Sequence, residues 1–391
     1  MRALLAAYGA ELRRIRSDPA AFSTLVLAVL VYALLYPQPY LNEAIRDVPV
    51  IVVDQDETAA SRELIRRIDA GEGAAVVATA TDMPAAREAF FARRVSAIVI
   101  VPPFFERDLL AGRQSPIAAY GDGGYFLVYR AAIGAVGGAA RSLGVAVATR
   151  RLVAQGTDPA LAAAWVDPLP TTQVPLFNPE GGYASYVVPA ALVLILQQTL
   201  LMGIGLLGAG RRGAPTDGAP IVAALAGKVL AYVSLYLVWL LFYCVILPWA
   251  YGLPRLGALA DLVALGLLFL LATSLLGATI ASLAPSRESV ILLLVVLGLP
   301  LFFLSGISWP AEALPQPVQW AALLIPSSSA IRALVRVNEM GASLAEVRME
   351  IATLLVLSVL YAMTGLLALS RARRGGPTPA PADAERPSAA C

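Results

Sequence analysis

The stretch ASYVVPAALVLILQQTLLMGIGLLG, residues 184–208, contains no charged residue and consists mostly of apolar side chains. A helix of about 20 such residues crosses the roughly 30 Å of hydrocarbon in a bilayer, so this stretch predicts a transmembrane helix. Five further windows share this character, apart from an acidic residue near one end of two of them. These windows are 19–42, 229–254, 257–284, 289–305 and 350–370. The sequence thus predicts an α-helical membrane protein with six transmembrane helices.

The composition excludes several classes of protein. Only 14% of the 391 residues are charged and 58% are hydrophobic, whereas soluble domains carry about 25% charged residues. The chain has no histidine, which excludes imidazole-based zinc sites, histidine general bases and Ser-His-Asp triads. Its net charge of +2 argues against a large nucleic-acid footprint. We find no pattern for a metal site, a bound cofactor or a catalytic nucleophile, and residues 226–229 lack the features of a phosphate loop.

Arginine distribution predicts the orientation of the chain. Segments 1–18, 209–228 and 371–391 carry most of the basic residues outside the spans and the long insertion, which places both termini in the cytoplasm and residues 43–183 outside. Apolar residues at 3- and 4-residue spacing in 1–18 predict an interfacial amphipathic helix, with a frayed basic tail as the alternative. Window 19–42 is too long for a usual signal peptide and has no A-x-A site, which favours an uncleaved anchor. The tail 371–391 is expected to be disordered.

The insertion at 43–183 has the pattern of an external α/β domain. A continuously apolar run at 49–54 predicts a strand buried on both faces. Strand and helix patterns then alternate, which predicts a layer with parallel pairing. The further strands are expected at 76–79, 96–101 and 116–120, and helices at 57–70, after Asp82, at 125–155 and after Asp158.

Two patterns in this insertion allow alternative interpretations. Asp54, Asp56 and Glu57 lie where the first strand ends, a position for binding a cation, although helix capping is the favoured interpretation. In the helix at 125–155, small residues every four positions permit close approach of another helix. That neighbour is either a second subunit or the helix's own domain. The small residues are Gly134, Gly138 and Ser142.

Polar and aromatic side chains in two spans are candidates for a substrate path. Gln197 and Gln198 lie in the middle of the second span, where an interhelical hydrogen bond is the alternative. The third span carries an aromatic face suited to apolar or cationic cargo, with interhelical packing as the alternative. This face consists of Tyr232, Tyr236, Trp239 and Tyr243.

Residues 306–330 are too short and too broken for two spans. Their prolines, glycine and tryptophans predict a re-entrant helix pair before the last span. This element is a candidate external gate, or alternatively a lid over loops. The gate candidates are Trp309, Pro310, Trp320 and Pro326.

Three segments in this order resemble the permease subunit of ABC-2 type exporters: VPVIVVDQDETAASRELIRRIDA (48–70), LFNPEGGYASYVVPAALVLILQQTLLMG (176–203) and FFLSGISWPAEALPQPVQWAALLIPSSSAIRALVRV (302–337). The resemblance covers nearly the whole chain and is greatest to a drug-exporter-like subgroup that works with a HlyD-like periplasmic adaptor. It implies a bacterial inner-membrane location, a second permease copy or homologue, and a separate cytoplasmic ABC ATPase that uses ATP. In that subgroup an adaptor and an outer-membrane channel complete the assembly.

The resemblance also implies that the loop between the second and third spans contacts the ATPase. Candidate coupling residues are Arg211, Arg212 and Asp217. The loop lacks the family's usual basic–acidic pair, and the alternative is a solvated basic turn. We therefore expect a permease without its own ATPase site that moves amphipathic or drug-like substrates. A non-transporting membrane scaffold or receptor with an external ligand-binding domain is the alternative function.

Overall fold

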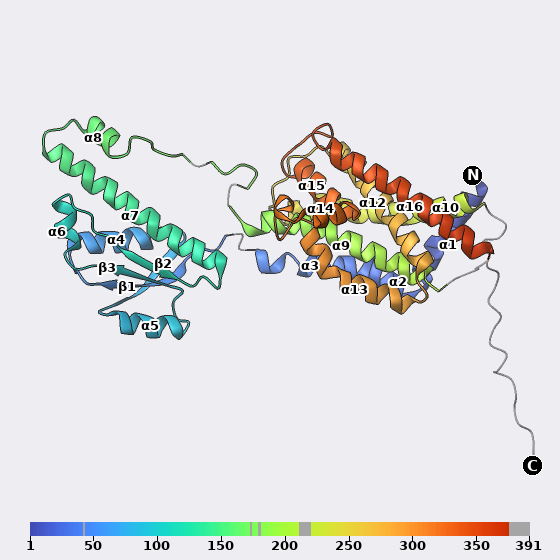
Figure 1. The fold of residues 1–391 in the computed structure, drawn as a ribbon, viewed down its shortest axis with the longest axis horizontal. Coiled ribbons are helices and arrows are strands. Elements are labelled where there is room, and N and C mark those ends of the chain that lie inside the picture. Colours follow the sequence, from blue (N-terminus) through green and yellow to red (C-terminus); the bar gives the residue numbers. More distant parts are fainter. Residues whose placement is uncertain (42–43, 173, 179–180, 211–219, 375–391) are drawn as a thin grey trace, which may run out of the picture. The chain divides into compact units, whose positions relative to one another are not determined.

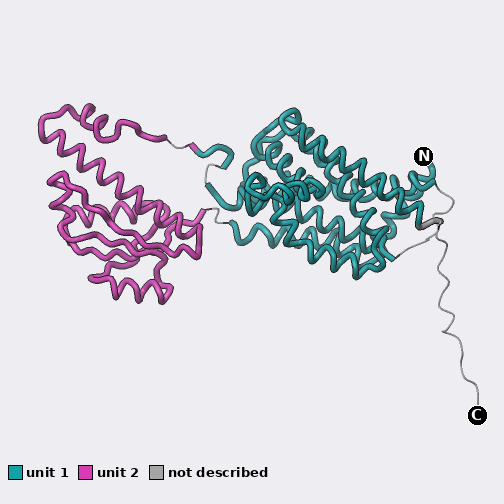
Figure 2. Tube along the Cα trace, viewed as in Figure 1, with its two compact units in different colours: residues 1–43, 175–391 teal, residues 44–174 magenta. Residues whose placement is uncertain are grey.

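The computed structural model describes all residues except 42–43, 173, 179–180, 211–219 and 375–391 (Figure 1). The chain divides into two compact units (Figure 2). One unit contains Met1–Glu43 and Pro175–Cys391, and the other contains Ala44–Val174. We call them the helical unit and the α/β unit.

The α/β unit is built on a four-stranded sheet of order β2-β1-β3-β4. β1 pairs in parallel with both neighbours, and β4 is antiparallel to β3. The central strand is apolar throughout because helices cover both of its faces. The strands are β1 (Val48–Asp54), β2 (Ala74–Ala80), β3 (Ala97–Val101) and β4 (Ala118–Gly121).

Helices form a layer on each face of this sheet (Figure 1). α5 (Met83–Phe91) packs on one face through Ala86 and Ala89. On the other face lie α4 (Ala59–Asp69), α6 (Phe105–Leu110) and α7 (Phe126–Ala154), and α8 (Pro159–Val166) contacts α7.

The helical unit contains the predicted spans in sequence order. Its first span is segmented into α2 (Pro19–Phe22), the π-helical turn η1 (Ser23–Leu27) and α3 (Ala28–Leu35). A second π-helical turn interrupts the helix that begins with α10. The longer helices are α1 (Arg2–Ser17), α9 (Tyr183–Gly208), α10 (Ile221–Leu241) with η3 (Phe242–Ile246) and α11 (Leu247–Tyr251), α12 (Leu259–Leu283), α13 (Arg287–Leu304) and α16 (Arg348–Arg374). Two short 3-10 turns, η2 (Gln38–Tyr40) and η4 (Ala311–Ala313), lie in connections.

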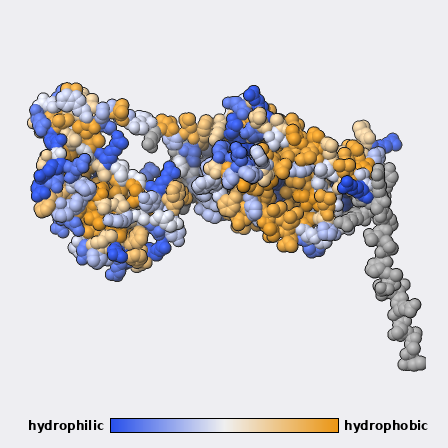
Figure 3. All heavy atoms as spheres, in the orientation of Figure 1, coloured by the Kyte–Doolittle hydropathy of each residue, from blue (hydrophilic) through white to orange (hydrophobic). Residues whose placement is uncertain are grey.

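Within the described part of the chain, seven helices are long and apolar enough to cross a membrane. One of them is α7, whose Ala132, Val136 and Leu143 are buried against the sheet of the α/β unit. The others belong to the helical unit, where apolar side chains cover much of the visible surface (Figure 3). The structure thus confirms a mostly helical chain with a small sheet.

The re-entrant region differs from the sequence expectation in extent. α14 (Gln316–Leu323) and α15 (Pro326–Asn338) meet at a bend of 85°. α15 continues to Asn338, beyond the predicted limit at 330, because its apolar side packs on α9, α12 and α16. α10 likewise begins at Ile221 rather than at 229, since Lys228 interrupts the uncharged window without ending the helix.

Candidate functional site

The aromatic face of α10 contacts the amino-terminal helices. The hydroxyl of Tyr232 donates to Glu11 Oε1 at 2.6 Å, and the hydroxyl of Tyr243 donates to the backbone carbonyl of Val29 at 2.6 Å. Trp239 Nε1 donates to the carbonyl of Leu25 at 3.1 Å. The fourth member of this face, Tyr236, is completely buried. These are contacts of interhelical packing, and a role in a substrate path stays a prediction.

The two glutamines of α9 point to different neighbours. Gln197 is fully buried, and its Oε1 accepts a 2.7 Å hydrogen bond from the backbone N–H of Ser327 at the start of α15. Gln198 lies on the α13 side, because a Cβ added at Gly298 of that helix would lie 3.7 Å from Gln198 Nε2. The contact of Gln197 matches the interhelical hydrogen bond considered as an alternative. The structure does not bring the two amides together.

A buried polar network joins α1 to α9 and α10, and the sequence analysis missed it. Glu11 is only 3% exposed. Its Oε2 pairs with Arg14 Nη1 at 2.7 Å, and Arg14 Nη2 donates to the carbonyl of Leu207 at 2.7 Å. Tyr232 completes the network on Glu11 Oε1. An acid on the same helical face as buried Ile15 is the signal that the sequence offered.

Asp18 makes a second attachment at this end of the helical unit. It caps α2 by accepting the backbone N–H of Ala21 at 3.1 Å, and it pairs with Arg287 of α13 at 2.9 Å. The Ala21 hydrogen bond and the Arg287 charge together keep the pKa of Asp18 below its ordinary value. The predicted coupling residues Arg211, Arg212 and Asp217 lie outside the described residues.

The predicted external gate residues do not form one cluster of contacts. Trp309 and Trp320 are 57% and 66% exposed, and Pro310 is exposed as well. Pro326 is buried at the first position of α15, where a missing N–H does no harm to the helix. The exposed tryptophans suit a bilayer interface, and the gate itself stays a prediction.

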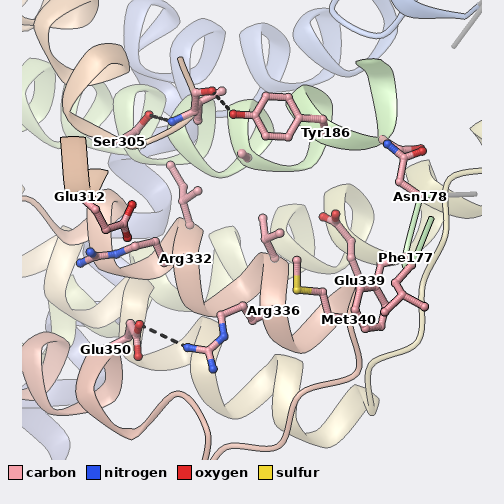
Figure 4. A pocket seen from close by; sticks show the side chains of 17 residues that line it. Phe177, Asn178, Tyr186, Ser305, Glu312, Arg332, Arg336, Glu339, Met340 and Glu350 are labelled. Carbon is pink, nitrogen blue, oxygen red and sulfur yellow. Dashed lines mark hydrogen bonds and ion pairs between the residues drawn. The ribbon is translucent and has the colours of Figure 1, made fainter. Parts of the chain in front are cut away.

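Behind these residues lies a cavity of about 470 Å³, which we call the α15 cavity (Figure 4). Its size is within the usual range for small-molecule sites. Its walls come from the segment before α9, the first turns of α9, the α13 end, α15 and the start of α16. Apolar lining residues include Leu176, Phe177, Ile307, Val335 and Met340.

Five charged residues also line the α15 cavity, namely Glu312, Arg332, Arg336, Glu339 and Glu350. Arg336 Nη1 pairs with Glu350 Oε1 at 3.6 Å. Glu339 directly follows α15, outside the candidate spans, and is only 8% exposed. Burial raises the pKa of its carboxyl to about 8. The sequence analysis missed this group, although the spacing of Arg332, Arg336 and Glu339 places them on one side of a helix.

The acids at the end of β1 are occupied by hydrogen bonds of the chain itself. Asp54 Oδ1 accepts the N–H groups of Asp56 and Glu57, and its Oδ2 accepts the hydroxyl of Ser61 at 2.6 Å. Asp56 accepts the hydroxyl of Thr58 at 2.6 Å and the N–H groups that begin α6 at 3.0 and 2.9 Å. Partial burial alone would raise the pKa of Asp56, but these hydrogen bonds lower it below its ordinary value. This geometry is that of capping and turn formation.

The small residues of α7 have two environments. Ser142 Oγ accepts a hydrogen bond from Arg67 Nη1 of α4 at 2.6 Å, so this position packs within its own unit. A Cβ added at Gly134 or Gly138 would meet no atom within 4 Å. These two glycines therefore lie on a side of α7 that the described chain leaves open.

The apolar helices and the compact insertion define a multi-pass membrane protein. A family model described as ABC-2 family transporter protein matches residues 20–367. The chain therefore belongs to the ABC-2 transporter family and is a membrane permease of an ABC exporter. Family membership implies partnership with an ATPase subunit. Among curated proteins, the search finds no match.

Proposed function

We propose that this chain is the export permease of a complex in which a separate cytoplasmic ATPase drives amphipathic substrates out of the inner membrane. The observation that carries the proposal is the family match over 20–367, which includes both the apolar helices and the inserted α/β unit. The buried anchoring of α1 on α9 and α10 supports it, because a permease needs a rigid connection at the end that receives force. Glu11, Arg14 and Tyr232 form that connection.

The proposed topology has six spans, both termini in the cytoplasm and the α/β unit in the periplasm. Assigning α7 to the core of the α/β unit leaves six of the seven apolar helices for the bilayer. The loop containing Arg211 and Arg212 then faces the ATPase. A permease dimer and a HlyD-like adaptor complete the proposed assembly, and the open side of α7 at Gly134 and Gly138 supports a protein contact there.

Copurification tests the ATPase partnership. The tagged full chain should retain an ATP-hydrolysing subunit with nucleotide-binding motifs when it is extracted gently from its native membranes. Arg211→Glu together with Arg212→Glu should release this subunit without changing the amount of membrane-inserted permease. If the wild-type chain repeatedly purifies without any ATPase, a scaffold or receptor function becomes the better interpretation.

Cysteine labelling tests the topology. Cys244 is buried in the helical unit and Cys391 is the last residue. In a Cys244→Ala background, a membrane-impermeant maleimide should label Cys391 in inverted vesicles but not in spheroplasts. Labelling in spheroplasts would place the carboxyl terminus outside and overturn the six-span arrangement.

A further inference from the structure

The α15 cavity contains one carboxylate that the protein leaves without a matching charge. Arg336 pairs with Glu350 at 3.6 Å, and Figure 4 shows Glu312 beside Arg332 on the same side of the cavity. Two arginines thus lie next to two of the three acids. Among the described residues, no ion pair involves the third acid, Glu339.

Glu339 also lacks a hydrogen-bond donor. Its Oε1 is buried without a hydrogen-bond partner among the described residues. The nearest polar groups along the chain are already engaged, because Arg255 Nε donates to Asn338 Oδ1 at 3.1 Å and the amide of Asn178 bonds to the backbone of Gly182. A buried acceptor that remains unsatisfied destabilises the protein, so this oxygen is suited to a donor supplied from outside the chain.

The surroundings of Glu339 define what kind of donor fits. Phe177, Tyr186, Val335 and Met340 supply apolar surface to the same cavity. Tyr186 holds its position by donating its hydroxyl to the carbonyl of Ile307 at 2.7 Å. A ligand therefore meets one carboxylate acceptor and a mainly apolar wall, which matches a positively charged head with an attached hydrocarbon part.

We propose that the α15 cavity binds a protonated organic amine, with the Glu339 carboxylate accepting its N–H groups and the apolar wall contacting its hydrocarbon chain. The inference rests on the proposed export function, whose substrate class it narrows to amphipathic amines. A neutral or anionic amphiphile would leave the Glu339 oxygen without a charge-assisted hydrogen bond. A quaternary ammonium would supply the charge but no N–H donor.

Binding to the full-length chain in nanodiscs of zwitterionic lipid tests the proposal. Tritiated decylamine should bind at pH 7, where alkylamines are protonated, in excess of its binding to empty nanodiscs. Unlabelled decylamine should displace it at least tenfold better than decyltrimethylammonium, and decyl sulfate should not displace it. Equal displacement by decyl sulfate would overturn the proposal.

Matched variants assign the binding to one carboxylate. Glu339→Gln, which keeps the size of the side chain, should weaken decylamine binding about tenfold and abolish the preference over decyltrimethylammonium. Glu312→Gln at the exposed side of the same cavity should change binding less than about twofold. Thermal unfolding of each variant shows that it is folded, and wild-type affinity in Glu339→Gln would overturn the proposal.

These measurements use neither ATP nor an ATPase. If amine binding is found but no ATPase copurifies, the cavity inference stands and the export function fails. If the ATPase copurifies but Glu339→Gln binds decylamine normally, the export function stands and the cavity inference fails.

Discussion

At the residue scale, the helical unit treats its buried carboxylates in two ways. Glu11 is surrounded by donors from Arg14 and Tyr232, which offset the loss of water around its charge. Glu339 is nearly as buried but has an oxygen without a donor. Sequence patterns predicted neither, because each is a single acid whose environment is set by segments far away in the chain.

Tyr232→Phe tests the energetic role of the Glu11 network. The substitution removes the hydroxyl donor from Glu11 Oε1 but keeps the ring, so we expect a loss of about 1–3 kcal/mol of stability. Thermal unfolding in a mild detergent measures it. Tyr8→Phe is the matched control, because Tyr8 joins the same two helices through a longer 3.3 Å contact with Ser234. Its loss should stay below about 0.5 kcal/mol, and equal losses would contradict this role of Glu11.

The stability of the helical unit should depend on pH through Glu339. Its pKa is raised by burial from 4.5 to about 8, so the folded state holds the proton more tightly than the unfolded state. The resulting stability is fully present below pH 4.5 and is lost as pH rises through about 8. At pH 8, Glu339→Gln should exceed the wild type by on the order of 3 kcal/mol.

Thermal unfolding across this pH range, without added amine, measures the difference. Glu312→Gln provides the control, since the exposed Glu312 side chain keeps its water in both states. Parallel pH profiles for the wild type and Glu339→Gln would contradict the expected cost of ionising this carboxyl.

At the element scale, uncharged windows predicted the membrane helices well because hydrophobicity alone decides which segments enter a bilayer. The ends of α10 and α15 were harder to predict. Lys228 and the charged side of α15 look like loop residues in a linear pattern, although tertiary contacts accommodate them. The short α6 was not predicted, because its start is fixed by a distant acceptor, Asp56.

The packing of α1 on α10 depends on a glycine. A Cβ at Gly227 would lie 2.5 Å from the carbonyl oxygen of Leu4 and 2.7 Å from Ala7 Cβ. Gly227→Ala must therefore push α1 away, at a cost of about 1–3 kcal/mol. Hydrogen exchange of the α1 amides should become faster.

Gly137→Ala in α7 is the control for the added methyl group. A Cβ at Gly137 meets no atom within 4 Å, and alanine favours a helix by about 0.5–1 kcal/mol. Exchange in α7 should therefore slow slightly or stay unchanged. Undisturbed α1 amides in Gly227→Ala would show that the two helices are not in close contact in solution.

At the scale of the whole molecule, the two units have separate cores. The sheet residues and their covering helices form clusters that contain no residue of the membrane helices. The sequence predicted this division, because charge and strand patterns return abruptly within the insertion. It did not predict the α15 cavity, whose walls come from five segments of the helical unit.

Separate cores predict separate unfolding. Val52 is fully buried in the sheet, so Val52→Ala should destabilise the α/β unit by about 2 kcal/mol. Hydrogen exchange of the full chain should become faster in β1 and β3 and stay unchanged in α9 and α12. The reciprocal variant Leu200→Ala in α9 should have the opposite pattern. Faster exchange in both units with either variant would show a single cooperative unit.

The paired π turns have a consequence for how the first span and α10 stay matched. A π turn holds about one residue more than an α turn, which rotates everything beyond it by roughly 100° about the helix axis. η1 and η3 lie where Trp239 and Tyr243 bond to Leu25 and Val29, so both helices carry this offset at the same junction. Deleting one residue from either turn alone would swing the outer half of that helix out of phase with its neighbour. The two irregularities therefore work as a pair of interlocked notches, and only a compensating deletion in both helices would restore their alignment.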